Sequence, residues 1–325
     1  MQYRQFGNTG FMASEIGLGT WQFGGDWGEI SDEQVNSILK AALDSGVNFF
    51  DTADVYGAGR SETLVGKILQ NQSVNTFVAT KLGRLEGYPD DYSLELLKRC
   101  TENSLRRLGR EAIDLIQLHC VPVSWLKEGE IFDWLRVLRS EGKIRHFGAS
   151  VETMEQALIC LEQDGITSLQ IVFNIFRQKP LQTLFKKAVE KKVALVIRLP
   201  LASGLLTGKY TTDTVFSPSD HRSYNRDGQA FNAGETFSGL DFDYGLDLVN
   251  QIRPLVPASM SMSQFALRFI LDHPEVSVVI PGASRSKQVV SNVSAASFEP
   301  LGRHVHLALG QLYKNAIEKN IRVEI

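Results

Sequence analysis

Four polar side chains that can move a proton fall at related places along the chain. Asp51, Lys81 and His119 each end a short apolar run, and Tyr56 lies in the segment just after Asp51. Taken singly, each also suits a structural role, such as a loop cap for Asp51 or a core histidine for His119. If the runs are strands of one parallel barrel, however, their carboxyl ends share one mouth, where such barrels place their active sites. We therefore expect the four side chains to converge.

The chemistry that suits this set is proton transfer to a carbonyl oxygen. A free phenol has a pKa of roughly 10, and a nearby cation such as Lys81 is expected to lower the pKa of Tyr56. Asp51 would hold the ammonium group in place. A neutral His119 would donate a hydrogen bond that orients the substrate oxygen. None of the four can donate a hydride, so a cofactor must supply it.

Strands and helices alternate through most of the 325 residues. The expected strands are 15–19, 47–51, 77–81, 113–119, 144–149, 169–173, 193–199 and 276–280. The expected helices are 31–46, 61–69, 93–108, 131–141, 154–164, 181–191, 263–271 and 286–293. This alternation implies parallel strands with right-handed crossovers. Eight pairs predict an α/β fold of the closed (β/α)8 type, a TIM barrel, although an open doubly wound sheet would give much of the same pattern.

Three segments lie outside the repeat. Residues 3–14 are expected to form a β-hairpin ahead of the barrel. Residues 210–243 are polar and glycine-rich, and so long a loop inside a compact domain usually has a function. Residues 307–319 predict an extra C-terminal helix. Because no interdomain linker is recognisable, we expect residues 1–325 to form a single domain.

Longer stretches around the four polar residues resemble one protein family. The stretches are GLGTW at 17–21, FFDTADVYG at 49–57, ETLVG at 62–66, TK at 80–81, DLIQLH at 114–119, GKIR at 142–145, PLASGLLTGK at 200–209 and IPGA at 280–283. In this order, and over nearly the whole chain, they resemble the motifs of the aldo-keto reductases, in particular the bacterial reductases and potassium-channel β-subunits. The resemblance implies an oxidoreductase with Asp51, Tyr56, Lys81 and His119 as its catalytic tetrad and Tyr56 as general acid/base.

The same resemblance implies that NADP(H) lies across the barrel mouth. The glycines at 17–19 and 57–59 do not complete a dinucleotide fingerprint, since Gln22 and Glu62 stand in the place of the third glycine. By resemblance, the residues at the nicotinamide end are Thr20, Trp21, Ser150, Gln170 and Arg198; those along the pyrophosphate are Pro200, Leu201, Ser203, Gly204 and Lys209; and those at the adenosine end are Gly282, Ala283, Ser284, Arg285, Gln288 and Asn292.

Two places depart from the family pattern. Arg198 stands where an aromatic residue usually stacks on the nicotinamide; a guanidinium plane can also stack, but the contact is charged. Gly282 and Gln288 replace basic residues that several relatives direct at the 2′-phosphate, which leaves Arg285 as the best candidate for that contact. Other basic residues in nearby segments are Lys287, Arg222 and Arg226. We expect NADP(H) to be preferred, with NAD(H) as the alternative.

Composition limits the classes of partner. The net charge of −3 provides no basic footprint for nucleic acid, and no apolar stretch approaches the length of a membrane span. Three scattered cysteines suit a reducing compartment, so we expect a cytoplasmic protein. The six histidines include one close pair, at 304 and 306, without a ligand-spaced acidic cluster, so no metal site is expected.

Several functions remain open. The first is reduction of aldehydes or ketones, and its alternative is an NAD(P)-dependent sugar dehydrogenase that works in the oxidative direction. A lyase forming a Schiff base on Lys81 would leave Tyr56 and the cofactor-like segments unexplained. A further possibility is a regulatory subunit that keeps the reductase fold. The polar 210–243 segment, with Trp21, Trp27 and Trp125, is expected to form a pocket for a polar, sugar-like carbonyl substrate. The sequence does not indicate the oligomeric state.

Overall fold

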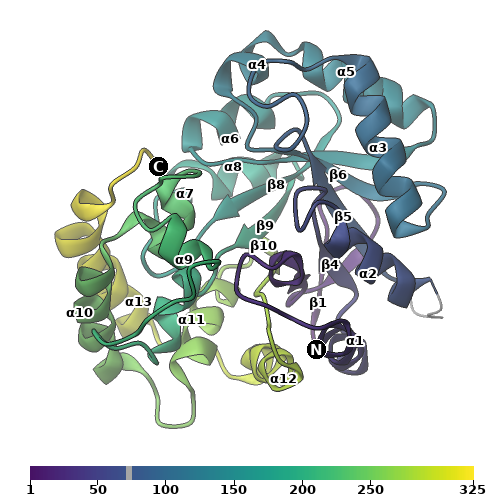
Figure 1. The fold of residues 1–325 in the computed structure, drawn as a ribbon. Coiled ribbons are helices and arrows are strands. Elements are labelled where there is room, and N and C mark those ends of the chain that lie inside the picture. Colours follow the sequence, from purple (N-terminus) through teal and green to yellow (C-terminus); the bar gives the residue numbers. More distant parts are fainter. Residues whose placement is uncertain (71–74) are drawn as a thin grey trace.

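The chain is built around eight parallel strands that close into a barrel (Figure 1). The computed structural model describes residues 1–70 and 75–325. The strands are β3 (Leu18–Gly19), β4 (Phe49–Asp51), β5 (Phe77–Leu82), β6 (Ile113–His119), β7 (Ile144–Ser150), β8 (Ile166–Val172), β9 (Ala194–Arg198) and β10 (Val276–Val279). Each strand pairs with the next along the chain. Parallel bridges from Ile16 to Val279 and from Gly19 to Gly282 join the first strand to the last, so the predicted TIM barrel is confirmed.

Helices form the outer layer of the barrel (Figure 1). They are α1 (Asp32–Asp44), α2 (Arg60–Leu69), α3 (Leu94–Leu108), α4 (Val123–Glu128), α5 (Glu130–Ser140), α6 (Met154–Leu161), α7 (Pro180–Thr183), α8 (Phe185–Glu190), α9 (His221–Tyr224), α10 (Phe242–Ile252), α11 (Met262–Leu271), α12 (Ser286–Ser294) and α13 (Arg303–Leu312). None of the described helices is both long and apolar enough to cross a membrane.

Local sequence explains where these helices begin and end. The Ser31 side chain accepts a hydrogen bond from the backbone of Gln34 and caps α1, and Ser93 caps α3 in the same way. Gly109 ends α3 in a left-handed conformation with φ of 60°, which glycine adopts without steric cost. These signals, together with apolar faces, are why the helix predictions largely match the structure.

The expected N-terminal hairpin, β1 (Tyr3–Gln5) with β2 (Met12–Ser14), closes the end of the barrel opposite the carboxyl ends of the strands. The Phe6 ring lies 5.1 Å from that of Phe49 and 5.2 Å from that of Phe77. The guanidinium of Arg4 donates hydrogen bonds to carbonyl oxygens of Leu271, His273 and Val276. Because this end is filled, an open cavity can form only at the other end.

Three expectations about the elements need correction. The segment 210–243 is not free of regular structure, because it contains α9 and the start of α10, which buries Phe242, Leu246 and Val249. Strand β8 begins at Ile166, three residues before the predicted start. The C-terminal helix begins at Arg303 and continues as a π-helical turn to Ile317.

Candidate active site

The carboxyl ends of three neighbouring strands place the expected polar residues together. Asp51 is the last residue of β4, Lys81 lies next to last in β5, and His119 ends β6. Strands β4, β5 and β6 are adjacent in the sheet. The loop from β4 to α2 returns Tyr56 over Lys81, so the four side chains that are distant in sequence meet at one end of the barrel.

Lys81 links Asp51 to Tyr56. Its ammonium group lies 2.6 Å from Oδ1 of Asp51, 2.8 Å from the carbonyl oxygen of Thr52 and 3.2 Å from the hydroxyl oxygen of Tyr56. An ammonium group has three hydrogens to donate, and these three contacts account for all of them. The Lys81 side chain is fully buried.

Two amide side chains hold the other oxygen of Asp51. Gln170 donates to Oδ2 across 2.7 Å and Gln117 across 3.3 Å. The Ser150 hydroxyl lies 3.4 Å from Oε1 of Gln170. Asp51 therefore orients the Gln170 amide as well as Lys81. The role of Gln117 was not recognised from the sequence, although its position two residues before His119 in one strand places both side chains on the same face.

The protonation states differ in one respect from those expected. Burial raises the pKa of Tyr56, and the opposing effect of Lys81 does not overcome it, so the expected lowering is wrong. Tyr56 therefore carries its proton at neutral pH. Burial also disfavours the charge of Lys81, but its ion pair with Asp51 and its contact with Tyr56 raise the pKa of Lys81 overall.

His119 is neutral at physiological pH. Burial lowers its pKa well below the usual range, and Arg84, Lys81 and Arg198 lower it further. Its Nδ1 is buried and has no hydrogen-bond partner among the described residues. The His119 ring meets the Tyr56 ring edge to face, with centroids 6.0 Å apart. A neutral imidazole beside a protonated phenol can hold a carbonyl oxygen between them.

A cavity of about 390 Å³ opens over Tyr56 and His119. The expected residues that line it are Thr20, Trp21, Asp51, Tyr56, His119, Gln170, Arg198, Pro200, Leu201, Ser203, Gly204, Gly282, Ala283, Ser284 and Gln288. The expected residues that lie outside its lining are Lys81, Ser150, Lys209, Arg285 and Asn292. The structure thus brings most of the predicted site residues around a single opening.

The segment 210–243 forms one side of this cavity. Tyr210, Arg222, Tyr224, Phe231 and Glu235 all line it, so the interpretation of the segment as functional is supported by its position. Trp21 and Trp27 also line the cavity. Trp125 does not, because its ring packs on Tyr92 and Trp134, and its expected place in the substrate pocket is wrong.

The turn after β9 shows how closely the backbone follows the cavity. Leu199, Ala202, Ser203 and Gly204 all have positive φ. A Cβ on Gly204 would lie 2.2 Å from the hydroxyl oxygen of Tyr210, so only glycine fits beneath that ring. Residues of this turn, among them Leu199, Ser203 and Gly204, line the cavity.

The basic side chains considered for the 2′-phosphate, which include Arg285 and Lys287 at the start of α12, separate into engaged and free groups. Arg222 is ion-paired with Asp220, and the guanidinium of Arg226 lies 5.2 Å from the Phe242 ring. Arg285 and Lys287 are exposed and form no ion pair within the part of the chain that the structure describes.

At this same helix start, Oε1 of Gln288 accepts hydrogen bonds from the backbone N–H of Ser284, at 2.8 Å, and of Arg285, at 3.0 Å. Its amide is thus used to cap α12.

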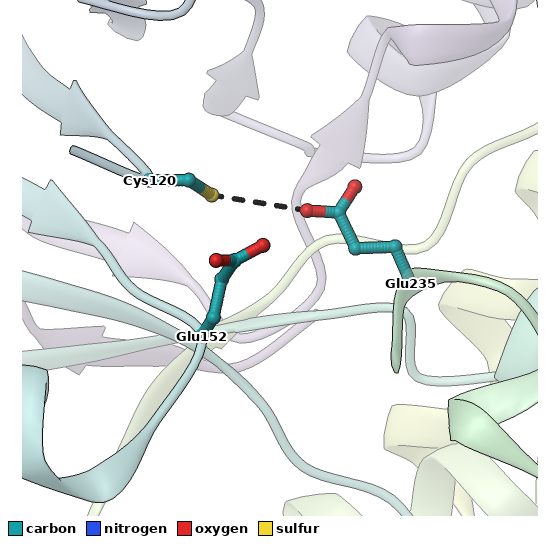
Figure 2. Close-up of side chains that lie close together, drawn as sticks. All are labelled: Cys120, Glu152 and Glu235. Atoms are coloured by element: carbon teal, nitrogen blue, oxygen red, sulfur yellow. Dashed lines mark hydrogen bonds between the residues drawn. The ribbon is translucent and has the colours of Figure 1, made fainter. Parts of the chain in front are cut away.

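A charged cluster that the sequence did not reveal borders the cavity. Figure 2 shows Glu235 close to Cys120 and Glu152. Arg84 lies 2.9 Å from Oε1 of Glu235, and Arg198 lies 3.2 Å from the same oxygen. Arg198 therefore enters an ion-pair network on the side where an aromatic stacking residue was expected.

The charges in this cluster are set by its two arginines. Burial alone would raise the pKa of Glu235, but Arg84 and Arg198 lower it to about 2, so Glu235 is ionised. Burial raises the pKa of the Cys120 thiol to about 12. A cation among Cys120, Glu152 and Glu235 would lie beside two guanidinium groups, so electrostatics favour the ion pairs over metal ligation. No sequence signal singled out Glu235 within the polar 210–243 segment.

Comparisons with known proteins agree on one family. The model of the "Aldo/keto reductase family" matches residues 15–313. The chain is 30% identical over 301 residues to the "Aldo-keto reductase YhdN" of Bacillus subtilis, covering 89% of this chain and 87% of that protein. Among solved structures it is similar to the aldo-keto reductase AKR11C1 from Bacillus halodurans in its holo form, with a TM-score of 0.79, 27% identity and coverage of 99% and 100% of the two chains.

A second solved structure, the glycerol dehydrogenase AKR11B4 from Gluconobacter oxydans, has a TM-score of 0.78 and 28% identity. The similarity covers 100% of this chain and 97% of that one.

Proposed function

The chain belongs to the aldo/keto reductase family, and from this premise we propose that it reduces aldehydes or ketones to alcohols with NADP(H) as the hydride donor. The observation that carries the proposal is the hydrogen-bonded chain from Asp51 through Lys81 to Tyr56. It ends at a cavity that a neutral His119 also lines. Residues 1–325 would act together as one domain.

The proton chemistry follows from the contacts of these side chains. A substrate carbonyl oxygen placed between Tyr56 and His119 would accept a hydrogen bond from each. As a hydride reaches the carbonyl carbon, charge develops on the oxygen, and the Tyr56 hydroxyl gives up its proton to it. The phenolate that remains is stabilised by Lys81, 3.2 Å away. Asp51 keeps the ammonium group in place, so no rearrangement is needed during the step.

The residues around the cavity suit a nicotinamide dinucleotide. Bound NADPH would supply the hydride. Gln170 and Ser150 would contact the carboxamide, the turn from Leu199 to Gly204 would contact the pyrophosphate, and Arg285 would contact the 2′-phosphate. The free, exposed guanidinium of Arg285 supports NADP(H) over NAD(H), because the additional 2′-phosphate needs a cation that is not already paired.

The structure argues against a Schiff-base lyase. Lys81 is completely buried, and three acceptors hold its ammonium group. Its pKa is raised, whereas a Schiff base requires a neutral, accessible amine. Oxidation of an alcohol is a better-supported alternative, because the chain is similar to a glycerol dehydrogenase. The same chain from Asp51 through Lys81 to Tyr56 would serve this reaction in reverse, with Tyr56 accepting the proton of the alcohol.

The proposal can be tested by titrating the purified protein with NADPH and NADH while following tryptophan fluorescence. NADPH consumption is then measured with a panel of aldehydes, and the alcohol product is quantified. We expect tighter binding of NADPH and one alcohol for each NADPH oxidised. Binding of neither cofactor would overturn the proposal, and preferred binding of NADH with alcohol oxidation would favour the dehydrogenase.

A further inference from the structure

Besides the proton-transfer chain, a second polar pair lies in the cavity wall. Arg84 follows β5, and Glu235 lies in the segment after α9; both line the cavity. Nη1 of Arg84 lies 2.9 and 3.2 Å from the two carboxylate oxygens of Glu235. The Glu235 side chain is 4% exposed and that of Arg84 is 17% exposed. A buried ion pair of this kind is costly to desolvate, and the proton transfer described above does not use it.

A continuous wall connects this pair with Tyr56. The Trp21 ring lies 6.1 Å from the Tyr56 ring, and the Phe231 ring lies 6.0 Å from the Trp21 ring. The Arg84 guanidinium lies 5.2 Å from the centre of the Phe231 ring. Trp21, Phe231 and the ion pair therefore form one wall of the cavity beside Tyr56.

Contacts with Cys120 also place the Arg84–Glu235 pair close to the part of the cavity where the substrate carbonyl would react. Cys120 follows His119 directly, and its sulfur lies 3.9 Å from Nη1 of Arg84 and 3.8 Å from Oε1 of Glu235. The pair thus contacts the residue next along the chain to the histidine that would hold the carbonyl oxygen. Substrate atoms next to the carbonyl would be the ones to reach it.

The charges of the pair indicate what it can bind. Arg84 and Arg198 both pair with Glu235, and Glu152 lies beside Glu235, so a substrate anion would meet Glu235 and a substrate cation would meet Arg84 and Arg198. Every hydrogen bond that Arg84 donates within the described residues uses Nη1, which leaves the N–H groups of Nε and Nη2 as donors. A hydroxyl group both donates and accepts, and it matches a fixed guanidinium beside a fixed carboxylate.

We propose that Arg84 and Glu235 bind a hydroxyl group of the substrate next to its reacting carbonyl, and that they select uncharged hydroxyaldehydes and hydroxyketones. This inference rests on the proposed carbonyl reduction and adds its substrate class. A pocket built to bond a hydroxyl group rejects the analogue without it, because its own polar groups are then left unpaired.

The test compares kcat/KM for three short aldehydes under identical cofactor conditions: D-glyceraldehyde, propanal, which has the same carbon chain without hydroxyls, and glyoxylate, which carries a carboxylate. We expect D-glyceraldehyde to exceed propanal by about tenfold or more, the value of a hydrogen bond to a charged group, and to exceed glyoxylate as well. A preference for propanal or for glyoxylate would overturn the inference.

Variants test whether Arg84 and Glu235 cause the preference for glyceraldehyde over propanal. Glu235→Gln and Arg84→Met should each reduce the glyceraldehyde-to-propanal ratio to near one, because the rate with glyceraldehyde falls more. Arg99→Met, which breaks an exposed ion pair with Glu86 outside the cavity, should keep the wild-type ratio. Arg84→Lys keeps the positive charge and should retain part of the preference for glyceraldehyde. It replaces Arg84→Met in the test if that variant does not fold.

The outcomes separate the two proposals. A merely structural role of the pair would lower both rates equally and leave the ratio unchanged, which would overturn the subsite while carbonyl reduction stands. If the wild-type protein reduces none of the three aldehydes, both proposals fail.

Discussion

The ammonium group of Lys81 lies 2.6 Å from Oδ1 of Asp51, with the two side chains 0% and 3% exposed. Lys81→Met leaves Asp51 as a buried charge without its partner, and breaking a buried pair in this way costs about 3–5 kcal/mol. We expect that loss in the free energy of unfolding measured with urea, together with the loss of turnover. Lys98→Met, which breaks an exposed pair with Glu141, should cost about 1 kcal/mol or less. Equal costs for the two variants would contradict the account.

Asp54 makes stability depend on pH. Burial, assisted by Glu62, raises the pKa of Asp54 to about 7, whereas an unfolded Asp titrates near roughly 3.9. Between these values the unfolded state binds fewer protons, so stability falls as pH rises from about 4 to about 7 and then levels off. Asp54→Asn should remove this loss. On going from pH 5 to pH 8, the free energy of unfolding of the variant should therefore fall by about 2–3 kcal/mol less than that of the wild type.

Urea unfolding of the wild type and Asp54→Asn at both pH values measures this difference. Asp44→Asn, at a position away from the cavity on α1, is the control and should follow the wild type. If the Asp54→Asn variant loses as much stability as the wild type on going to pH 8, Asp54 is not the group responsible.

Arg285 should contribute to the choice of cofactor. Its exposed guanidinium at the start of α12 has no ion pair within the described chain, and a charge-assisted phosphate contact is worth about tenfold or more in affinity. Arg285→Gln should raise the dissociation constant for NADPH by about that factor and leave that for NADH nearly unchanged. Arg303→Gln, at an exposed arginine that begins α13 outside the cavity lining, is the matched control. Equal effects of Arg285→Gln on both cofactors would assign the 2′-phosphate to another residue.

Arg322 holds together the two ends of the segment that carries Glu235. Its guanidinium donates to the carbonyl oxygens of Arg226, at 3.2 Å, and Leu240, at 3.1 Å. Arg322→Gln removes the guanidinium group that makes both contacts, so the segment should open more often. Residues 226–240 should then be cleaved several-fold faster in limited proteolysis. Lys319→Gln, on the same C-terminal part of the chain, is the control. Unchanged cleavage would show that other contacts hold the segment.

The convergence of Asp51, Tyr56, Lys81 and His119 could be predicted from the sequence because strand ends in a barrel converge whatever the loops do. Asp51, Lys81 and His119 needed only the strand boundaries, and Tyr56 needed only a short return of the loop after Asp51. The barrel followed from eight strand–helix pairs, each of which carries its own periodicity and capping residues.

The contacts made by long polar segments could not be predicted. Glu235 is one acid among several between 210 and 243, and only the folded segment brings it to Arg84 and Arg198. The pKa of Tyr56 was misjudged for a related reason: Lys81 was visible in the sequence, whereas the burial that outweighs it depends on the whole cavity wall. Helix α10 was not predicted although Asp241 caps it. The expected glycine-rich loop was extended to residue 243, which lies beyond the start of the helix at Phe242.

The central claim is that Tyr56 is the proton donor, and a single variant tests it most directly. Tyr56→Phe removes the hydroxyl group and keeps the ring that packs beside Trp21 and His119. The dissociation constant for NADPH should stay within about twofold of the wild type, while single-turnover oxidation of bound NADPH by an aldehyde should slow by roughly 10²-fold or more. Near-normal turnover in Tyr56→Phe would contradict the account.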